Sequence, residues 1–165
     1  MKLSEHLDLS EVTRSDMAKR SGISNEPTAE HLENFKKLAE HIFEPIRKHF
    51  AKPIIISSGY RSEALNKAIG GSLTSQHCKG EAIDIDMDGT TGGVTNAMVF
   101  NYIKDNLPFD QLILEFEQNR APQWIHVSYS SKGTQRKQIL IAVKLPNGGT
   151  QYIPYTEADY KRIYG

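Results

Sequence analysis

The chain has 165 residues, and its 20 Lys and Arg balance 20 Asp and Glu, so the formal net charge is zero. This length fits one globular domain with a sizeable core and leaves little room for two. A balanced charge without a long run of residues of one charge argues against a protein that binds nucleic acid or an anionic membrane non-specifically. Cys78 is the single cysteine, which excludes an intramolecular disulfide, so any metal site must use His and carboxylate ligands.

The first residues lack the apolar stretch of a secretory signal, and no window approaches the roughly 20 apolar residues of a membrane span. We therefore expect a soluble protein with no signal peptide in this sequence, no membrane insertion and no nucleic-acid partner. A monomer is the expected state.

The first third of the chain divides into a polar arm and a helix. Residues 1–27, with helix-start candidates at Thr13–Asp16, predict a loosely structured arm with one short helix that belongs to the same domain. From Thr28 to Lys48, apolar residues recur at a spacing of three and four, which is typical of an amphipathic helix. Pro45 is expected to bend its last turn. Residues 28–165 are predicted to form the main domain.

The remainder predicts short helices and strands that are separated by turn signals. We expect a strand over residues 52–57, a short helix from Ser62 to Gly70, a strand over 82–87 and a helix over 96–106 capped by Thr95. Further strands are expected at 111–116, 124–129 and 138–144, the last forming a C-terminal hairpin with 150–154. Helices followed by strands predict an α+β domain, with helices packed on one face of a largely antiparallel sheet.

One stretch carries most of the chemical information. His77 lies in a polar, Gly-flanked loop, seven residues before Asp84, which interrupts an apolar strand. A carboxylate in the middle of a strand is costly unless it is paired or binds a metal. His126 repeats the pattern in a later strand, and two His with one Asp match the three protein ligands of a catalytic zinc site. The spacing alone leaves open that either histidine is a satisfied core or rim residue.

The wider pattern resembles a known family. The motif S-x-H-x-x-G-x-A-x-D at residues 75–84, together with S-x-G-Y-R at 57–61 and W-x-H-V at 124–127, is similar to the signature of the zinc D-Ala-D-Ala carboxypeptidases. That family shares its fold with the Hedgehog signalling domain, and the resemblance extends over residues 28–129. Its members cleave peptide bonds next to D-amino acids in peptidoglycan stem peptides. They act as D,D-carboxypeptidases, dipeptidases or the L-alanyl-D-glutamate endopeptidases of phage lysins, and the small phage and prophage members are the most similar.

The resemblance implies roles for individual residues. One Zn²⁺ would be bound by His77, Asp84 and His126. Arg61 would act in catalysis and substrate binding by approaching a substrate carboxylate or a polarised carbonyl. For Ser75 and Gln76 two interpretations stay open: ordinary loop residues or, with zinc present, substrate-binding residues that hydrogen-bond a substrate carbonyl. A zinc metallopeptidase of this kind would be cytoplasmic until released and would then act on the bacterial cell wall.

One departure from the family pattern leaves the general base open. Many relatives carry an acid three residues before the second histidine, but this chain has Gln123, whose amide cannot accept a proton from water at neutral pH. Glu115 is the preferred substitute, because its strand is predicted to lie beside that of His126. Glu117 is a weaker candidate.

Gln123 also favours an alternative function, a non-catalytic zinc-containing module of the same fold that binds cell-wall peptide or protein. A third interpretation is a metal-free structural protein of a phage particle.

Overall fold

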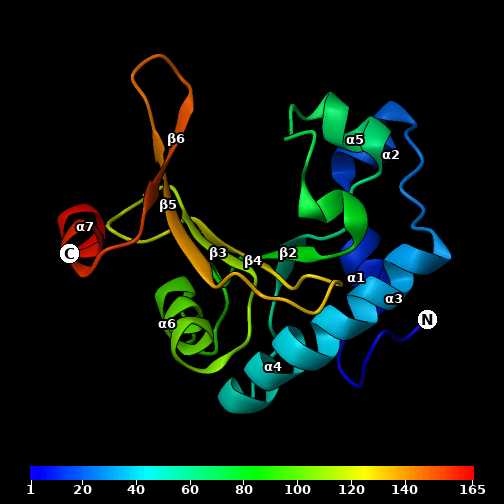
Figure 1. Cartoon of the computed structure of the whole chain (residues 1–165), viewed down its shortest axis with the longest axis horizontal. Helices are drawn as coiled ribbons and strands as arrows, with labels where there is room; N and C mark the ends of the chain where they lie inside the picture. The colour runs from blue at the N-terminus through cyan, green and yellow to red at the C-terminus, as the bar shows by residue number, and fades with distance from the viewer.

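A computed structural model describes all residues, 1–165, and is built around one six-stranded sheet (Figure 1). The strands lie in the order β1-β2-β4-β3-β5-β6. Their bounds are β1 Ile56–Ser58, β2 Ala82–Ile85, β3 Gln111–Glu115, β4 Trp124–Ser128, β5 Gln138–Lys144 and β6 Thr150–Pro154. All neighbouring strands are antiparallel except β3 and β5, which are parallel. The predicted α+β class with a largely antiparallel sheet is therefore confirmed.

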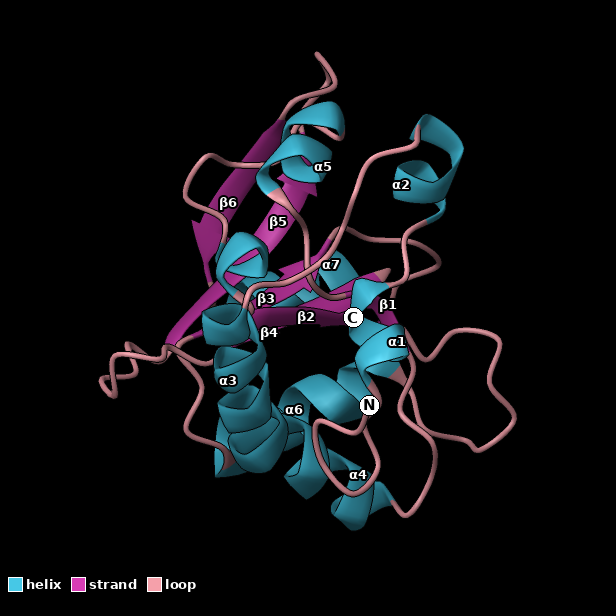
Figure 2. Ribbon diagram, turned by 90° about the vertical axis from the view of Figure 1, so that its right-hand side faces the viewer, coloured by secondary structure: helices cyan, strands magenta, loops and turns pink.

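The longer helices cover one face of this sheet, as Figures 1 and 2 both show. They are α3 (Ala29–Leu38), η1 (Ala39–Phe43), α4 (Glu44–Phe50) and α6 (Asn96–Asn106). Between them and the sheet lies one cluster of buried apolar side chains, which includes Phe35, Phe43, Phe100, Ile83, Leu114 and Ile125. On the opposite face, α5 (Glu63–Ala68) and the β5–β6 hairpin rise on either side of the central strands (Figure 1).

The helix expected over residues 28–48 is continuous but irregular in its middle. A π-helical turn, η1, separates α3 from α4, so the distortion precedes Pro45 instead of bending the last turn. Pro45 has no N–H to donate to the preceding turn, so the regular hydrogen-bond pattern of the α-helix is interrupted there. A single π-helical turn within a helix is one form that such an interruption takes. The helix ends at Ala51, which adopts a left-handed conformation.

The N-terminal arm is more ordered than expected. It forms two short helices, α1 (Leu9–Thr13) and α2 (Asp16–Ser21), and Ser15 caps the second one. Leu7 and Val12 are completely buried in the core cluster. The prediction of a loose arm with one helix was wrong. A few apolar residues, widely spaced in this polar segment, hold the arm in place by packing against residues far away in the sequence.

Two other differences lie at the ends of elements. The strand predicted over residues 52–57 is shorter, because only Ile56–Ser58 pair with β2. The last eleven residues, for which no structure was predicted, contain helix α7 (Glu157–Tyr164), capped by Thr156. None of the helices has both the length and the apolar character needed to cross a bilayer.

Candidate metal centre and active-site cleft

Sheet register brings Asp84 and His126 together on the face away from the core helices. Asp84 on β2 lies directly opposite His126 on β4, which in turn lies opposite Ile113 on β3. Directly paired residues share a face of the sheet, so Asp84 and His126 project side by side. The neighbouring residues Ile83, Ile85, Ile125 and Val127 alternate to the other face and enter the core. The alternation of the two strands therefore places two polar side chains on an otherwise apolar frame.

His77 joins this pair from a 3₁₀ turn, η2 (Gln76–Lys79). The Ser75 hydroxyl caps the turn by accepting from the backbone N–H of His77, at 3.3 Å. Gly80 ends it with φ of +72°, and a Cβ there would collide with the backbone oxygen of His31 on α3. The serine and glycine of the motif thus set the path of the loop, and Gly80 lets it approach the helix closely.

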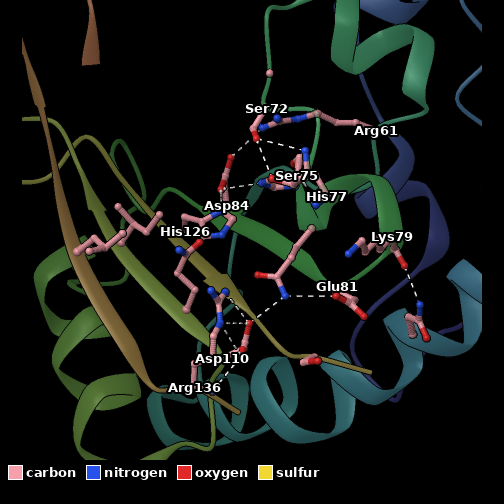
Figure 3. Close-up of a pocket in the computed structure, with 18 of the residues that line it drawn as sticks. Arg61, Ser72, Ser75, His77, Lys79, Glu81, Asp84, Asp110, His126 and Arg136 are labelled. Carbon is pink, nitrogen blue, oxygen red and sulfur yellow. Dashed lines mark hydrogen bonds and ion pairs between the residues drawn. The ribbon is translucent and has the colours of Figure 1, made fainter. Parts of the chain in front are cut away.

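The three side chains form one buried cluster (Figure 3). His77 Nε2 lies 3.2 Å and His126 Nδ1 lies 3.1 Å from Asp84 Oδ1, and the three donor atoms are within 4.8 Å of one another. Burial alone would raise the pKa of Asp84, but the imidazoles of His77 and His126 outweigh it and hold that pKa well below its usual range. Asp84 is therefore ionised at neutral pH.

The hydrogen bonds of this cluster fit a bound cation. His77 Nδ1 lies 2.6 Å from the carbonyl oxygen of Gly59, which can only accept, so Nδ1 carries the proton. In the neutral ring Nε2 then has a lone pair that faces the negatively charged Asp84 carboxylate, which is repulsive. A cation bound between the two atoms would remove this repulsion. His126 Nδ1 lies on the same carboxylate oxygen, and its Nε2 is buried without a hydrogen-bond partner. A carbonyl that orients a histidine in this way is typical of metal sites.

Arg61 lies at the edge of the cluster, just after β1. Its Nη2 is 3.6 Å from Asp84 Oδ2, and its Nε donates to the Ser58 hydroxyl at 3.4 Å. The side chain is only 17% exposed. The backbone N–H of Arg61 also donates to the carbonyl of His77, which ties the arginine to the histidine loop.

Glu115 lies on the same face of the sheet, one row from His126. It is opposite Trp124 on β4, and its side chain is 8% exposed. Burial, followed by the negative charge of Asp84, raises the pKa of Glu115 from 4.5 to about 7, while His126 and Arg61 oppose the shift. No hydrogen bond stabilises its carboxylate. These conditions suit a group that exchanges protons near neutral pH.

The other candidate acids and amides lie elsewhere. Gln123 is absent from the cleft lining, and its side chain reaches the Glu117 carbonyl at 3.5 Å. Glu117 is also absent from the cleft and accepts from the backbone N–H of Arg120. Asp86 accepts from Asn96 and from the backbone of Asp88, away from the histidines.

All the site residues open into one cleft of about 1330 Å³. Beside the metal cluster, the Gln76 amide donates both to Glu81, at 3.2 Å, and to Asp110, at 3.1 Å. Arg136 pairs with the buried Asp110 through Nη2 at 2.9 Å. This network was not predicted from the sequence, because Asp110 and Arg136 lie far from the motif along the chain. It occupies both N–H groups of the Gln76 amide and leaves its oxygen free.

A second group of possible ligands, Glu5, His6 and Glu44, lies at the N-terminal arm. Glu44 accepts hydrogen bonds there from the Ser4 hydroxyl and from the backbone and ring of His6. These contacts satisfy the buried carboxylate within the protein. The group therefore serves to hold the arm, and its donors need no cation.

Comparison with known proteins agrees with this geometry. A search of curated proteins found no match. A family model described as peptidase M15 matches residues 5–128, which include His77, Asp84, His126 and Glu115. Peptidases of this family are zinc-dependent, and the match extends over three quarters of the chain. With the fold, the motif and the His-Asp-His cluster in agreement, the chain belongs to the peptidase M15 family of zinc metallopeptidases.

Proposed function

We propose that this protein is a zinc-dependent peptidase that hydrolyses peptide bonds next to D-amino acids in bacterial peptidoglycan. The observation that carries the proposal is the buried cluster of His77, Asp84 and His126, whose donor atoms lie within 4.8 Å of one another at a cleft. The cluster lies inside the segment that matches the peptidase family.

Three donor atoms would hold the metal: His77 Nε2, Asp84 Oδ1 and His126 Nδ1. A zinc ion bound by two imidazoles and one carboxylate supplies a Lewis acid and makes water a better nucleophile near pH 7. The protein contributes the orientation of these donors. Gly59 fixes the proton on His77 Nδ1, and the β2–β4 register fixes the separation of Asp84 from His126.

Glu115 is the proposed general base. Its ionised carboxylate accepts a proton from the attacking water and then transfers it to the amine that leaves. Its position in the cleft, beside the Asp84–His126 pair, supports this role. Gln123 lies outside the cleft lining, so the amide at that position does not by itself argue for a non-catalytic module.

Arg61 and the η2 turn would bind the substrate. The guanidinium of Arg61 is permanently charged and offers paired donors to a substrate carboxylate or to a carbonyl oxygen that gains negative charge. The Ser75 hydroxyl can donate to a substrate carbonyl while its oxygen still caps the turn. The Gln76 oxygen, whose N–H groups are already engaged, would accept from a substrate N–H.

Digestion of purified peptidoglycan and of soluble stem peptides tests the proposal. With one equivalent of zinc, the protein should release fragments whose masses identify the cleaved bond and whether it is terminal or internal. His126→Ala should lose metal, measured by elemental analysis, and lose hydrolysis. A zinc-loaded protein that binds the stem peptide without cleaving it would instead support the non-catalytic module. Peptidoglycan left intact and unbound would overturn the proposal.

A further inference from the structure

The cleft is completed by a part of the chain that the family match does not include. The match ends at residue 128, whereas β5 and β6 follow at Gln138–Lys144 and Thr150–Pro154. Their hairpin stands on the side of the sheet that carries the metal cluster, across from α5 (Figure 1). Two hairpin residues, Leu140 and Tyr152, line the cleft.

The sheet register relates Tyr152 to the proposed general base. One row runs across four strands, with Trp124 opposite Glu115, Glu115 opposite Ala142 and Ala142 opposite Tyr152. These side chains share the face on which Asp84 and His126 lie one row away. Ala142, between Glu115 and Tyr152, has a side chain too short to separate them. Trp124 and Tyr152 are at the two ends of this row and both line the cleft, and the part of the cleft between them is called the trough below.

Tyr152 is not part of the hydrophobic core or of the side chains packed against it. Its side chain is 52% exposed, and its hydroxyl has no hydrogen-bond partner in the protein. Burial, followed by the charges of Glu115 and Asp84, raises the pKa of Tyr152, so the phenol remains protonated at neutral pH. A protonated hydroxyl within electrostatic reach of these two acids is available as a hydrogen-bond donor.

We propose that Tyr152 is a substrate-binding residue, whose ring packs against the peptide next to the scissile bond and whose hydroxyl donates to a peptide carbonyl. This inference rests on the proposed function for the class of substrate. Leu140 and Ile113, which pair in the neighbouring row, line the cleft with apolar groups, so the trough accepts a small aliphatic side chain, with Tyr152 and Trp124 on either side. Aromatic side chains with a polar tip are suited to such contacts, because one end is apolar and the other binds a polar group.

Trp124 offers a direct measurement of binding. It is the only tryptophan in the chain and lies in the same row as Tyr152, so its fluorescence should report a peptide in the trough. The experiment uses the zinc-loaded protein carrying Glu115→Gln, in which turnover is expected to be roughly 10²–10⁴-fold slower, and titrates a stem pentapeptide, L-Ala-D-Glu-L-Lys-D-Ala-D-Ala. In this background we compare Tyr152, Tyr152→Phe, Tyr152→Ala and the control Gln151→Ala. Gln151 is exposed, precedes Tyr152 and lies outside the cleft lining.

We expect Tyr152→Ala to weaken binding by about tenfold or more, Tyr152→Phe by about fivefold, as for one neutral hydrogen bond, and Gln151→Ala not at all. In the otherwise native enzyme, Tyr152→Ala should raise KM by a similar factor with little change in kcat. The melting temperature should stay within a few degrees, because the side chain is half exposed.

The outcomes separate this inference from the proposed function. Hydrolysis by the native protein, with peptide affinity unchanged in Tyr152→Ala, would overturn the role of Tyr152 and leave the peptidase intact. Binding that depends on Tyr152 in a native protein without hydrolytic activity would support the subsite and refute the enzyme. A native protein that does not bind the pentapeptide would overturn both.

Discussion

Glu115 differs from the other buried acids because nothing in the protein donates to its carboxylate. Asp84 faces two imidazoles, whereas Asp110 and Glu44 accept hydrogen bonds, and the pKa values of all three are lowered. The pKa of Glu115 is instead raised to about 7. A carboxylate kept in such an environment is poorly suited to a structural role and well suited to proton transfer.

The first prediction concerns catalysis by Glu115. Glu115→Gln should retain zinc but lower kcat by roughly 10²–10⁴-fold, because the amide cannot accept a proton from water. Hydrolysis of a stem peptide, with zinc content measured in parallel, provides the test. Glu117→Gln and Gln123→Glu are matched controls that should leave the rate unchanged, since both side chains lie outside the cleft lining. Full activity of Glu115→Gln would remove this residue from the mechanism.

The second prediction concerns the stability of the metal-free protein. The pKa of Glu115 is about 7 in the folded state and about 4.5 in the unfolded chain, so the folded chain binds more protons between these values. Its stability should therefore fall as the pH rises through this window. Glu115→Gln should raise the free energy of unfolding at pH 8 by up to about 3 kcal/mol and have little effect at pH 4. Urea unfolding with a chelator present measures both, and an equal effect at the two pH values would contradict the assignment.

The third prediction concerns Arg61. Arg61→Lys keeps the charge but loses the paired donors of the guanidinium, so kcat/KM should fall by about 10²-fold, as for loss of an oxyanion donor. Lysine keeps a positive charge beside Asp84, so the melting temperature should change little. Kinetics are compared at equal zinc occupancy. Equal activity of the two proteins would make Arg61 a structural residue.

At the scale of elements, a buried carboxylate joins the N-terminal arm to α4. Burial would raise the pKa of Glu44, but hydrogen bonds from the Ser4 hydroxyl and from His6 outweigh it and lower that pKa below 4.5. The arm is thus held by polar contacts as well as by Leu7 and Val12 in the core.

The fourth prediction follows from the sign of this shift. Because the pKa of Glu44 is lower in the folded state, its contribution to stability is present above about pH 4.5 and is lost as the pH falls through the folded value. Glu44→Gln should lower the free energy of unfolding by about 1–3 kcal/mol at pH 7, and by less at pH 3. Hydrogen exchange should show faster opening of residues 3–13 in the variant. A pH-independent difference would show that the charge is irrelevant.

At the scale of the whole molecule, the C-terminal segment completes both the sheet and the core. β3 pairs with β5 along the whole length of β3, and Ile141 on β5 is fully buried. The Tyr164 hydroxyl on α7 donates to the Phe116 carbonyl at 2.9 Å. Phe116 directly follows Glu115 and has a left-handed φ of 62°, so α7 supports the backbone beside the proposed base.

The fifth prediction tests whether the chain is one domain. A chain ending at residue 137 retains the family match but exposes β3 as an edge strand and removes Ile141 from the core. It should lose the cooperative thermal transition of the full chain, measured by circular dichroism, and should aggregate. A sharp transition near that of the full chain would show instead that residues 138–165 are an accessory to a smaller domain.

Much of this protein could be predicted from local sequence patterns. The spacing of apolar residues indicated α3 to α4 and α6, and caps such as Thr95 marked helix starts, because both depend on neighbours within a few residues. His77, Asp84 and His126 were singled out for a similar reason. Asp84 and His126 are polar residues within apolar strands, and His77 lies seven residues before Asp84 in the same motif.

Only the tertiary structure decided which residues meet. β3 lies between β4 and β5, and this order brings Glu115 into the cleft, leaves Gln123 outside its lining and adds Tyr152 from a hairpin beyond the motif. Strand order and register are set by side chains far apart in the chain, which pack together against the core helices, and a shift of one residue would turn Glu115 away from the metal cluster. The proposed ligands could be predicted from local pattern because each lies in a short motif, whereas the proposed base and the proposed substrate-binding residue depend on contacts that no short segment contains.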